Sequence, residues 1–372
     1  AEAGRDTLVV IFQRGACDGL SLLAPYEDAN YHKARPTIGV KPGQAIPVED
    51  GWGLHPNLAP LAPFFADGLG AAVVGAGIVD LPVRSHFEAM DEIERGNRAV
   101  DKVTGWLGRY VMTTPANGDA PFRVVASSGS PTSLRGAEPV TSLAGAAPLS
   151  LPNAAVTHPI LEALYRPTSG GPAVGTAGAA AFDLIDLTRT LFAGAYTPDA
   201  GAAYGTSSFS QLLRAAARVI KADLGTEIIT VDAGGWDTHF NMGAVGSGGV
   251  MDQLANDFGS SLGAFLTDLA DHLDRITVLV VTEFGRQVAQ NSTGGLDHGE
   301  GSVMFAFGGG VNGGVHGLAP DLSPGALVDN AYLATTDYRD VFAEALSLRM
   351  GASALDRILP GHTAAPLGLF RR

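Results

Sequence analysis

The protein has 372 residues, of which 46% are hydrophobic and 17% are charged, so the chain can bury a large core and is not a disordered segment. Its formal net charge of −14 excludes nucleic acid or an anionic membrane as the main partner, because either would repel it. No run reaches the roughly 18 apolar residues that a membrane helix needs, and the single cysteine, Cys17, excludes an internal disulfide.

Apolar runs and amphipathic segments alternate along most of the chain. Residues 7–12 (TLVVIF) are typical of a strand covered on both faces. The further strands expected are 71–77, 122–128, 227–235, 276–282 and 303–310. The helices expected are 57–70, 85–96, 103–113, 210–225, 251–275 and 337–350. In the second helix Ser85 is expected as the N-cap, with Glu88 completing a capping box.

The middle of the chain breaks this alternation. Residues from about Gly129 to Ala180 are rich in Ala, Gly, Pro and Ser and are interpreted as an irregular excursion or a small cap. Elsewhere, alternating strands and helices predict an α/β fold with a doubly wound, mostly parallel sheet and helices on both faces. We expect residues 1–372 to form one domain that carries this excursion.

Polar side chains follow the expected strands at the points where they end. They are Asp18, Ser85, Asp237, His239 and Glu283, together with Asp297 and His298, which precede the strand at 303–310. Since the carboxyl ends of parallel strands share one edge, these residues are expected to converge there. Carboxylates mixed with imidazoles suit a divalent cation such as Zn²⁺, Mg²⁺, Ca²⁺ or Mn²⁺.

Each of these residues also has a structural interpretation. Asp18 lies in a Gly-rich turn, where Asp is common for its own hydrogen bonds. Structurally, Asp237 would be a turn residue and His239 a surface histidine. Glu283 is able to pair with Arg286 in a structural salt bridge.

The interpretation of three more residues, Asp297 among them, is also open. His86 is either part of the site or an ordinary first-turn residue of its helix. Asp297 is able to orient the imidazole of His298. Cys17 is interpreted as a packed thiol, because the sulfatase maturation pattern C-x-P-x-R is absent. The sequence contains neither a nucleotide-binding glycine motif nor a G-x-S-x-G elbow.

Several segments together resemble one known family. They are RGACDGLS, YHKARPTIGV, GLHPNLAPL, RSHFEAMDEIERG, GGWDTHFN, VTEFGR, DHGEG, GGGVNGG and TTDYRDVFAEAL. In this order they resemble the family catalogued as domain of unknown function fifteen-hundred-and-one, which is grouped with the alkaline phosphatase and sulfatase superfamily. The resemblance implies a twin-arginine export signal and a periplasmic or secreted protein. The first residues, AEAGRD, look like the stub left by signal cleavage, although an intracellular start would look much the same.

The resemblance also implies roles for individual residues. Asp18 matches the acid after the first strand, Ser85 the nucleophile that opens a helix, and His298 the last metal histidine. Asp237 and His239 match an Asp and a His after a central strand, at a shorter spacing than in the phosphatases. The superfamily's usual histidine after Glu283 is Phe284 here, which implies a single-metal or altered site.

The hypothesis is a metal-dependent hydrolase of small anionic esters, phosphate or sulfate. A metal held by Asp18, Asp237, His239, Glu283 and His298 would activate Ser85. Arg84 or Arg14 would steady the substrate's oxygens, and His86 or Asp297 would shuttle protons. The alternatives are a degenerate phosphatase-like binding protein and a metal-dependent hydrolase or transferase of another bond type. The sequence does not indicate the substrate, the metal or the oligomeric state.

Overall fold

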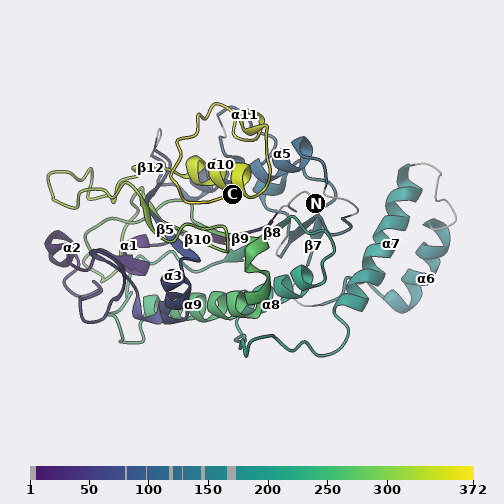
Figure 1. Ribbon diagram of the computed structural model, residues 1–372, viewed down its shortest axis with the longest axis horizontal. Coiled ribbons are helices and arrows are strands. Elements are labelled where there is room, and N and C mark those ends of the chain that lie inside the picture. Colours follow the sequence, from purple (N-terminus) through teal and green to yellow (C-terminus); the bar gives the residue numbers. More distant parts are fainter. Residues whose placement is uncertain are drawn as a thin grey trace.

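A computed structural model describes residues 6–79, 82–97, 99–116, 120–127, 129–143, 147–165 and 173–372 of the chain. Within them a nine-stranded sheet has the order β11-β5-β10-β9-β1-β8-β6-β7, with β12 pairing β5 (Figure 1). Its strands are β1 (Thr7–Gln13), β5 (Gly70–Gly77), β6 (Val124–Ala126), β7 (Thr141–Ser142), β8 (Ile228–Ala233), β9 (Ile276–Val281), β10 (Ser302–Phe307), β11 (Gly314–Gly317) and β12 (Thr336–Asp337). A small second sheet contains β2 (Leu23–Ala24), β3 (Ile46–Glu49) and β4 (Trp52–Leu54).

The predicted doubly wound, mostly parallel sheet is confirmed. Strand β1 runs parallel to β8 and β9, and β6 runs parallel to β8. The exception is β10, which is antiparallel to both of its neighbours, β5 and β9. The amino end of β10 therefore lies at the same edge as the carboxyl ends of β1, β5, β8 and β9.

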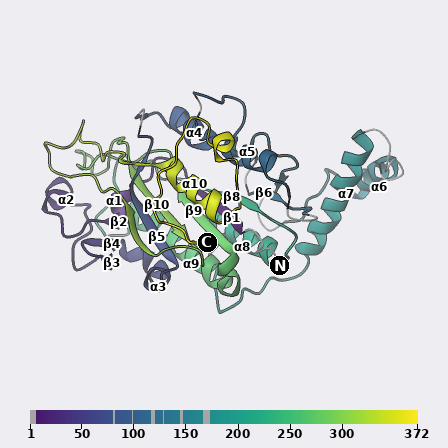
Figure 2. The same ribbon diagram turned by 45° about the horizontal axis from the view of Figure 1, so that its top comes forward.

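Helices cover both faces of the sheet, as Figure 2 shows. The α-helices are α1 (Gly19–Leu22), α2 (Ala29–Ala34), α3 (Ala62–Ala66), α4 (His86–Arg95), α5 (Trp106–Thr113), α6 (Ala154–Tyr165), α7 (Ala173–Leu191), α8 (Ser208–Lys221), α9 (Val250–Asp268), α10 (Tyr338–Leu348) and α11 (Leu355–Ile358). Short 3-10 helices lie at η1 (Pro56–Leu61), η2 (Thr132–Leu134) and η4 (Ala270–Arg275). Among the described residues, every helix is too short or too polar to span a bilayer.

The two faces form separate apolar cores because side chains alternate along each strand. On one face Val9 and Ile11 of β1 pack with residues of α3, α8 and α9. On the other, Leu8 and Val10 pack with residues of α4, α5, α10 and α11. There the rings of Trp106 (α5) and Phe342 (α10) stack with centroids 4.2 Å apart. Fully burying each large side chain contributes about 1.5–3 kcal/mol, so the strands are fixed from both sides.

Two expected helices differ in detail. The helix expected at 57–70 begins as the 3-10 helix η1, because Pro56 and Pro60 remove helical N–H donors. The helix expected at 251–275 ends at Asp268, whose buried carboxylate accepts hydrogen bonds from the Tyr196 and Tyr204 hydroxyls, at 2.7 and 2.9 Å. The chain continues as η4.

The excursion expected at 129–180 is partly helical. It contains α6 and the start of α7, and residues 166–172 lie outside the described residues. Figure 1 shows α6 and α7 side by side at one end of the molecule, and the rings of His158 and Phe182 contact each other with centroids 5.0 Å apart. Within α6 and α7 alanine and leucine, both good helix formers, are frequent, and Pro159 is the one proline inside α6.

Candidate metal centre

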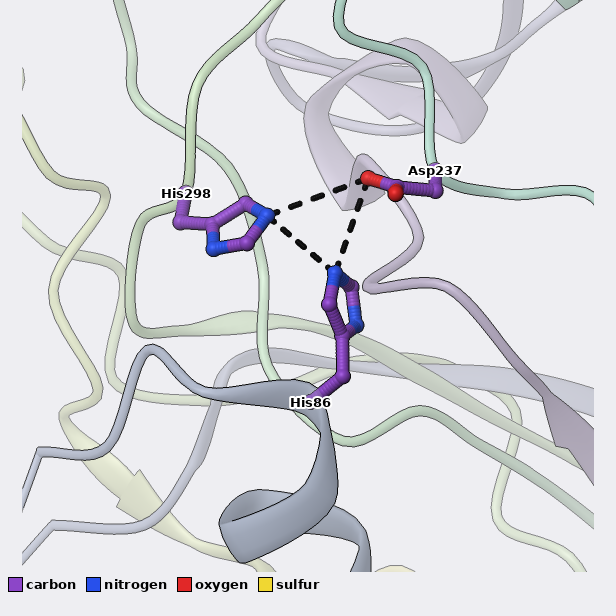
Figure 3. A group of neighbouring side chains, drawn as sticks. All are labelled: His86, Asp237 and His298. Atoms are coloured by element: carbon purple, nitrogen blue, oxygen red, sulfur yellow. Dashed lines mark hydrogen bonds and ion pairs between the residues drawn. The ribbon is translucent and has the colours of Figure 1, made fainter.

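Three polar side chains meet at the carboxyl edge of the sheet (Figure 3). His86 opens α4 after β5, Asp237 lies in the loop after β8, and His298 precedes the antiparallel β10. The two histidine Nε2 atoms lie 3.1 Å apart. Asp237 Oδ1 lies 3.6 Å from the Nε2 of His86 and 3.8 Å from the Nε2 of His298. These three atoms form a group of the size that holds one metal ion.

His239 adds a fourth donor to this group. Its Nε2 lies 2.9 Å from His298 Nε2 and 3.1 Å from Asp237 Oδ1. Ligands at the ~2.0–2.1 Å bond lengths of zinc stand ~3.3 Å apart around a tetrahedron. Five of the six distances between these four donors run from 2.9 to 3.8 Å and scatter around that value.

Hydrogen bonds at the far ring nitrogens set the tautomers of His86 and His298. His86 Nδ1 lies 2.8 Å from Glu283 Oε1, and His298 Nδ1 lies 2.8 Å from the carbonyl oxygen of Arg84. A carboxylate or a carbonyl oxygen only accepts, so Nδ1 must carry the proton in each ring. In the neutral form both Nε2 atoms then present lone pairs to each other.

His239 is held in the same way, although more loosely. Its Nδ1 lies 3.3 Å from Asp297 Oδ1, and Asp297 also accepts from Asn291 Nδ2 at 3.2 Å. All three imidazoles therefore turn Nε2 lone pairs toward the Asp237 carboxylate. Asp237 Oδ1 and His239 Nε2 also accept from the Arg286 guanidinium, at 2.7 and 3.3 Å, whereas no proton lies between the Nε2 atoms of His86 and His298. Electron pairs that face each other in this way are suited to a cation, and acceptors behind metal-binding imidazoles serve to orient them.

Burial lowers the pKa of His298, and the neighbouring charges of Arg286, His86 and His239 lower it further. The hydrogen bond to the Arg84 carbonyl opposes this shift without reversing it. His298 is therefore held in the neutral form, in which its Nε2 is able to bind a metal.

Glu283 lies behind His86 and is fully buried. Its carboxylate accepts the backbone N–H of Gly15 at 2.8 Å and the Thr282 hydroxyl at 3.1 Å, in addition to His86 Nδ1. A buried carboxylate requires such partners, because removing its charge from water is costly. Expected as a metal ligand, Glu283 instead orients the imidazole of His86 in this structure.

Arg286 is a buried cation beside the same cluster. Its guanidinium donates to the carbonyls of Ala16 at 2.7 Å and Leu296 at 3.2 Å. It also lies 2.7 Å from Asp237 Oδ1 and 3.3 Å from His239 Nε2. Although partial burial favours the neutral acid, the hydrogen bond and the charge of Arg286 hold the pKa of Asp237 below its usual value.

The structure does not bring Asp18 to the cluster. Its two carboxylate oxygens accept from the Nη1 and Nη2 atoms of Arg35, at 2.6 and 2.9 Å, and both side chains are buried. Arg35 also donates to the carbonyl of Val288 at 2.8 Å. Asp18 therefore anchors the loop after β1. The neighbouring Cys17 is fully buried, which raises the pKa of its thiol well above the usual value.

Ser85 stands at the N-cap position of α4 and is exposed. The expected capping box does not form, since the Ser85 hydroxyl makes no capping hydrogen bond. The hydroxyl therefore stays outside the helix, directly before His86.

The two arginines expected to steady a substrate already have carboxylate partners. Arg84 pairs with Glu300 at 2.8 Å. Arg14 pairs with Glu94 at 2.7 Å and with Asp232 at 2.8 Å. Both keep partly exposed guanidinium groups, and the structure assigns them first to holding the loops around the site.

The chain is therefore a doubly wound α/β protein that carries a histidine and aspartate cluster at the carboxyl edge of its sheet. The chain belongs to the family described as protein of unknown function (DUF1501), whose model matches residues 68–355. The predicted family is thereby confirmed. No curated protein matches the chain.

Several solved structures are similar to the chain at low identity. One is a protein of the alkaline phosphatase superfamily from Vibrio parahaemolyticus, with 10% identity and a TM-score of 0.40, covering 87% of this chain and 64% of that protein. A putative sulfatase from Bacteroides thetaiotaomicron has 8% identity and a TM-score of 0.38, covering 98% and 76%. The periplasmic domain of EptC from Escherichia coli, in complex with Zn, has 6% identity and a TM-score of 0.39, covering 82% and 74%. This chain thus spans less than two thirds of the Vibrio protein.

Proposed function

We propose that the protein is a metal-dependent hydrolase of phosphate or sulfate esters. The observation that carries the proposal is the convergence of three imidazole Nε2 atoms on the Asp237 carboxylate, each with its Nδ1 proton already donated to an oxygen. Protonating one imidazole at Nε2 would supply a hydrogen bond to one neighbouring Nε2 atom. It would also leave a charged imidazole beside the Arg286 guanidinium. A single divalent cation would satisfy the facing lone pairs of His86 and His298 and would share Asp237 with Arg286.

The donor set favours zinc among the four cations. Three nitrogens and one oxygen suit Zn²⁺ or another transition ion that prefers imidazole, whereas Mg²⁺ and Ca²⁺ prefer oxygen ligands throughout. Phe284 packs against the rings of His86 and His298, with centroids 4.9 Å away in both cases. An apolar side chain there supports a site for one ion.

The neighbouring groups fit the handling of an anionic ester. Bound at the cluster, the cation would polarise a phosphoryl or sulfuryl oxygen and neutralise the charge that develops on it. The first turn of α4 presents backbone N–H groups and the positive end of the helix dipole. Ser85 Oγ would attack phosphorus or sulfur and displace the alcohol, and water would then hydrolyse the serine ester to release the anion.

Metal analysis and ester assays test the proposal. We expect about one ion per chain by plasma mass spectrometry, and turnover of aryl phosphates, phosphodiesters or sulfates that a chelator abolishes and the metal restores. His298→Ala should lose the ion, whereas His316→Ala, a histidine on β11, should keep it. Turnover that continues after complete metal removal would overturn the proposal.

The role of Ser85 needs its own test. Ser85→Ala should abolish turnover and retain the metal. Ser207→Ala is the matched control, because Ser207 caps α8 through its side chain, which accepts from the Ser210 N–H at 3.1 Å. The control should lose about 1 kcal/mol of stability and keep its activity. An active Ser85→Ala enzyme would instead indicate hydrolysis by metal-activated water, and metal binding without turnover would indicate a binding protein.

The proposal includes export from the cytoplasm, which the family resemblance implies. One cysteine in 372 residues fits a cytosolic protein as well as one exported already folded, so this part of the proposal rests on the resemblance. Fractionation of cells that express the full-length gene checks this point, and recovery in the cytoplasmic fraction alone would contradict it.

A further inference from the structure

Two phenylalanines are exposed beside the candidate metal centre. Phe87 is 85% exposed and Phe240 is 64% exposed. Phe87 directly follows His86, and Phe240 directly follows His239. Among the exposed large hydrophobic side chains of the described residues, these two are the only aromatic ones. Exposing a phenylalanine ring to water is unfavourable, so two exposed rings that each directly follow a histidine of the cluster point to a ligand.

Hydrogen bonds and packing fix the backbone at both phenylalanines. The carbonyl of His239 accepts from Asn291 Nδ2 at 2.9 Å and from Thr293 Oγ1 at 3.0 Å, and the N–H of Asn241 donates to the Thr293 carbonyl at 3.1 Å. The backbone of this turn is therefore fixed both before and after Phe240.

Phe87 is the second residue of α4, which is anchored from its other face. Ala89 and Ile93 of this helix are buried in the core, and the Ala89 N–H donates to the Ser85 carbonyl at 2.9 Å. Rotating Phe87 into the core would require turning the whole helix. The exposure thus follows from the architecture of the site.

We infer that Phe87 and Phe240 form an aromatic rim that receives a ring-bearing group of the substrate, while its anionic group lies at the metal cluster. This inference rests on the proposed function and names its substrate class, esters of an aryl or sugar ring. Phenylalanine has no polar atom, so the rim selects a flat apolar face, which aryl rings and the faces of sugar rings both supply.

Binding of non-hydrolysable analogues tests the rim without relying on turnover. The metal-loaded full chain is titrated calorimetrically with phenylphosphonate and with methylphosphonate. Each stacked ring is expected to contribute about three- to tenfold in affinity, so phenylphosphonate should bind at least about tenfold more tightly. A hexose phosphonate is titrated in the same way. Tighter binding than phenylphosphonate indicates a sugar ligand, and weaker binding indicates an aryl ligand.

Variants separate stacking from general hydrophobicity. The double variant Phe87→Leu with Phe240→Leu should lose most of the preference, and the pair Phe87→Tyr with Phe240→Tyr should retain it. Leu318→Ala, an exposed apolar residue outside the site, is the control and should change nothing. Metal content should be equal in all of them. Equal binding of both phosphonates to the wild type, or binding of neither, overturns the inference, whereas absence of ester turnover overturns only the proposed function.

Discussion

Two aspartates near the site should respond to the same substitution in opposite ways. Asp18 is buried in a bidentate pair with Arg35, whereas Asp237 is 51% exposed and faces the histidine cluster. Asp18→Asn removes a charge from the fold's interior, and Asp237→Asn removes a charge from the candidate metal ligands. The pair of variants separates a structural carboxylate from a metal-binding one.

The magnitude follows from the burial of the ion pair. Breaking a buried pair by removing one partner costs about 3–5 kcal/mol, because the remaining charge is left uncompensated. The amide introduced at position 18 still offers one acceptor to Arg35, so we expect about 3 kcal/mol. Asp237 is half exposed, and its amide would still accept from Arg286, so Asp237→Asn should cost less than about 1 kcal/mol in the metal-free protein.

Urea denaturation of the metal-free proteins measures the stabilities, and plasma mass spectrometry of the reloaded proteins measures the bound metal. Asp18→Asn should lower the urea midpoint at unchanged slope and keep about one ion per chain. Asp237→Asn should keep the midpoint and lose the ion. Loss of metal from Asp18→Asn while its circular dichroism remains native would refute this account and restore Asp18 as a ligand.

Two further predictions concern histidine partners. Glu283→Gln should weaken metal binding about 10- to 100-fold by competition titration, because the amide orients His86 less well, and the exposed Glu88→Gln should not. Burial lowers the pKa of His55 from 6.5 to about 4, and its Nδ1 accepts the Asn57 N–H at 3.2 Å. The unfolded chain therefore binds more protons between these pH values, so stability, complete above about pH 6.5, should fall by up to about 3 kcal/mol toward pH 4. His55→Asn should flatten this slope in urea titrations, and an unchanged slope would contradict the assignment.

The sequence predicted the framework well because the strand signals are strong. Continuous apolar runs such as 276–282 identify strands buried on both faces, and the strand observed there is β9 (Ile276–Val281). Strand direction is not encoded in such runs. His298 precedes its strand, and in a wholly parallel sheet it would lie at the opposite edge from Asp237. The antiparallel β10 places both at one edge.

The role of Asp18 shows what a local pattern lacks. A carboxylate after the first strand indicates either a turn residue or a ligand, and the deciding partner, Arg35, is the residue that ends α2. Arg35 belongs to the segment YHKARP, which contributed to the family resemblance. Nothing in that segment predicts a contact with Asp18. Glu283 is similar, since its tie to His86 spans 197 residues of sequence. Such pairings arise only from the closed tertiary structure.

The arrangement of the cluster explains why metal loss should leave the fold intact. Each histidine ring is oriented by an acceptor on another segment: Glu283 after β9, the Arg84 carbonyl before α4, and Asp297 before β10. Those acceptors are held by strands whose side chains fill the two cores. The free energy of the fold therefore pre-organises the donors, and a bound cation would contribute by relieving their mutual repulsion. Binding should consequently stabilise the protein by an amount that rises with the logarithm of the free metal concentration above the dissociation constant, with the unfolding slope unchanged.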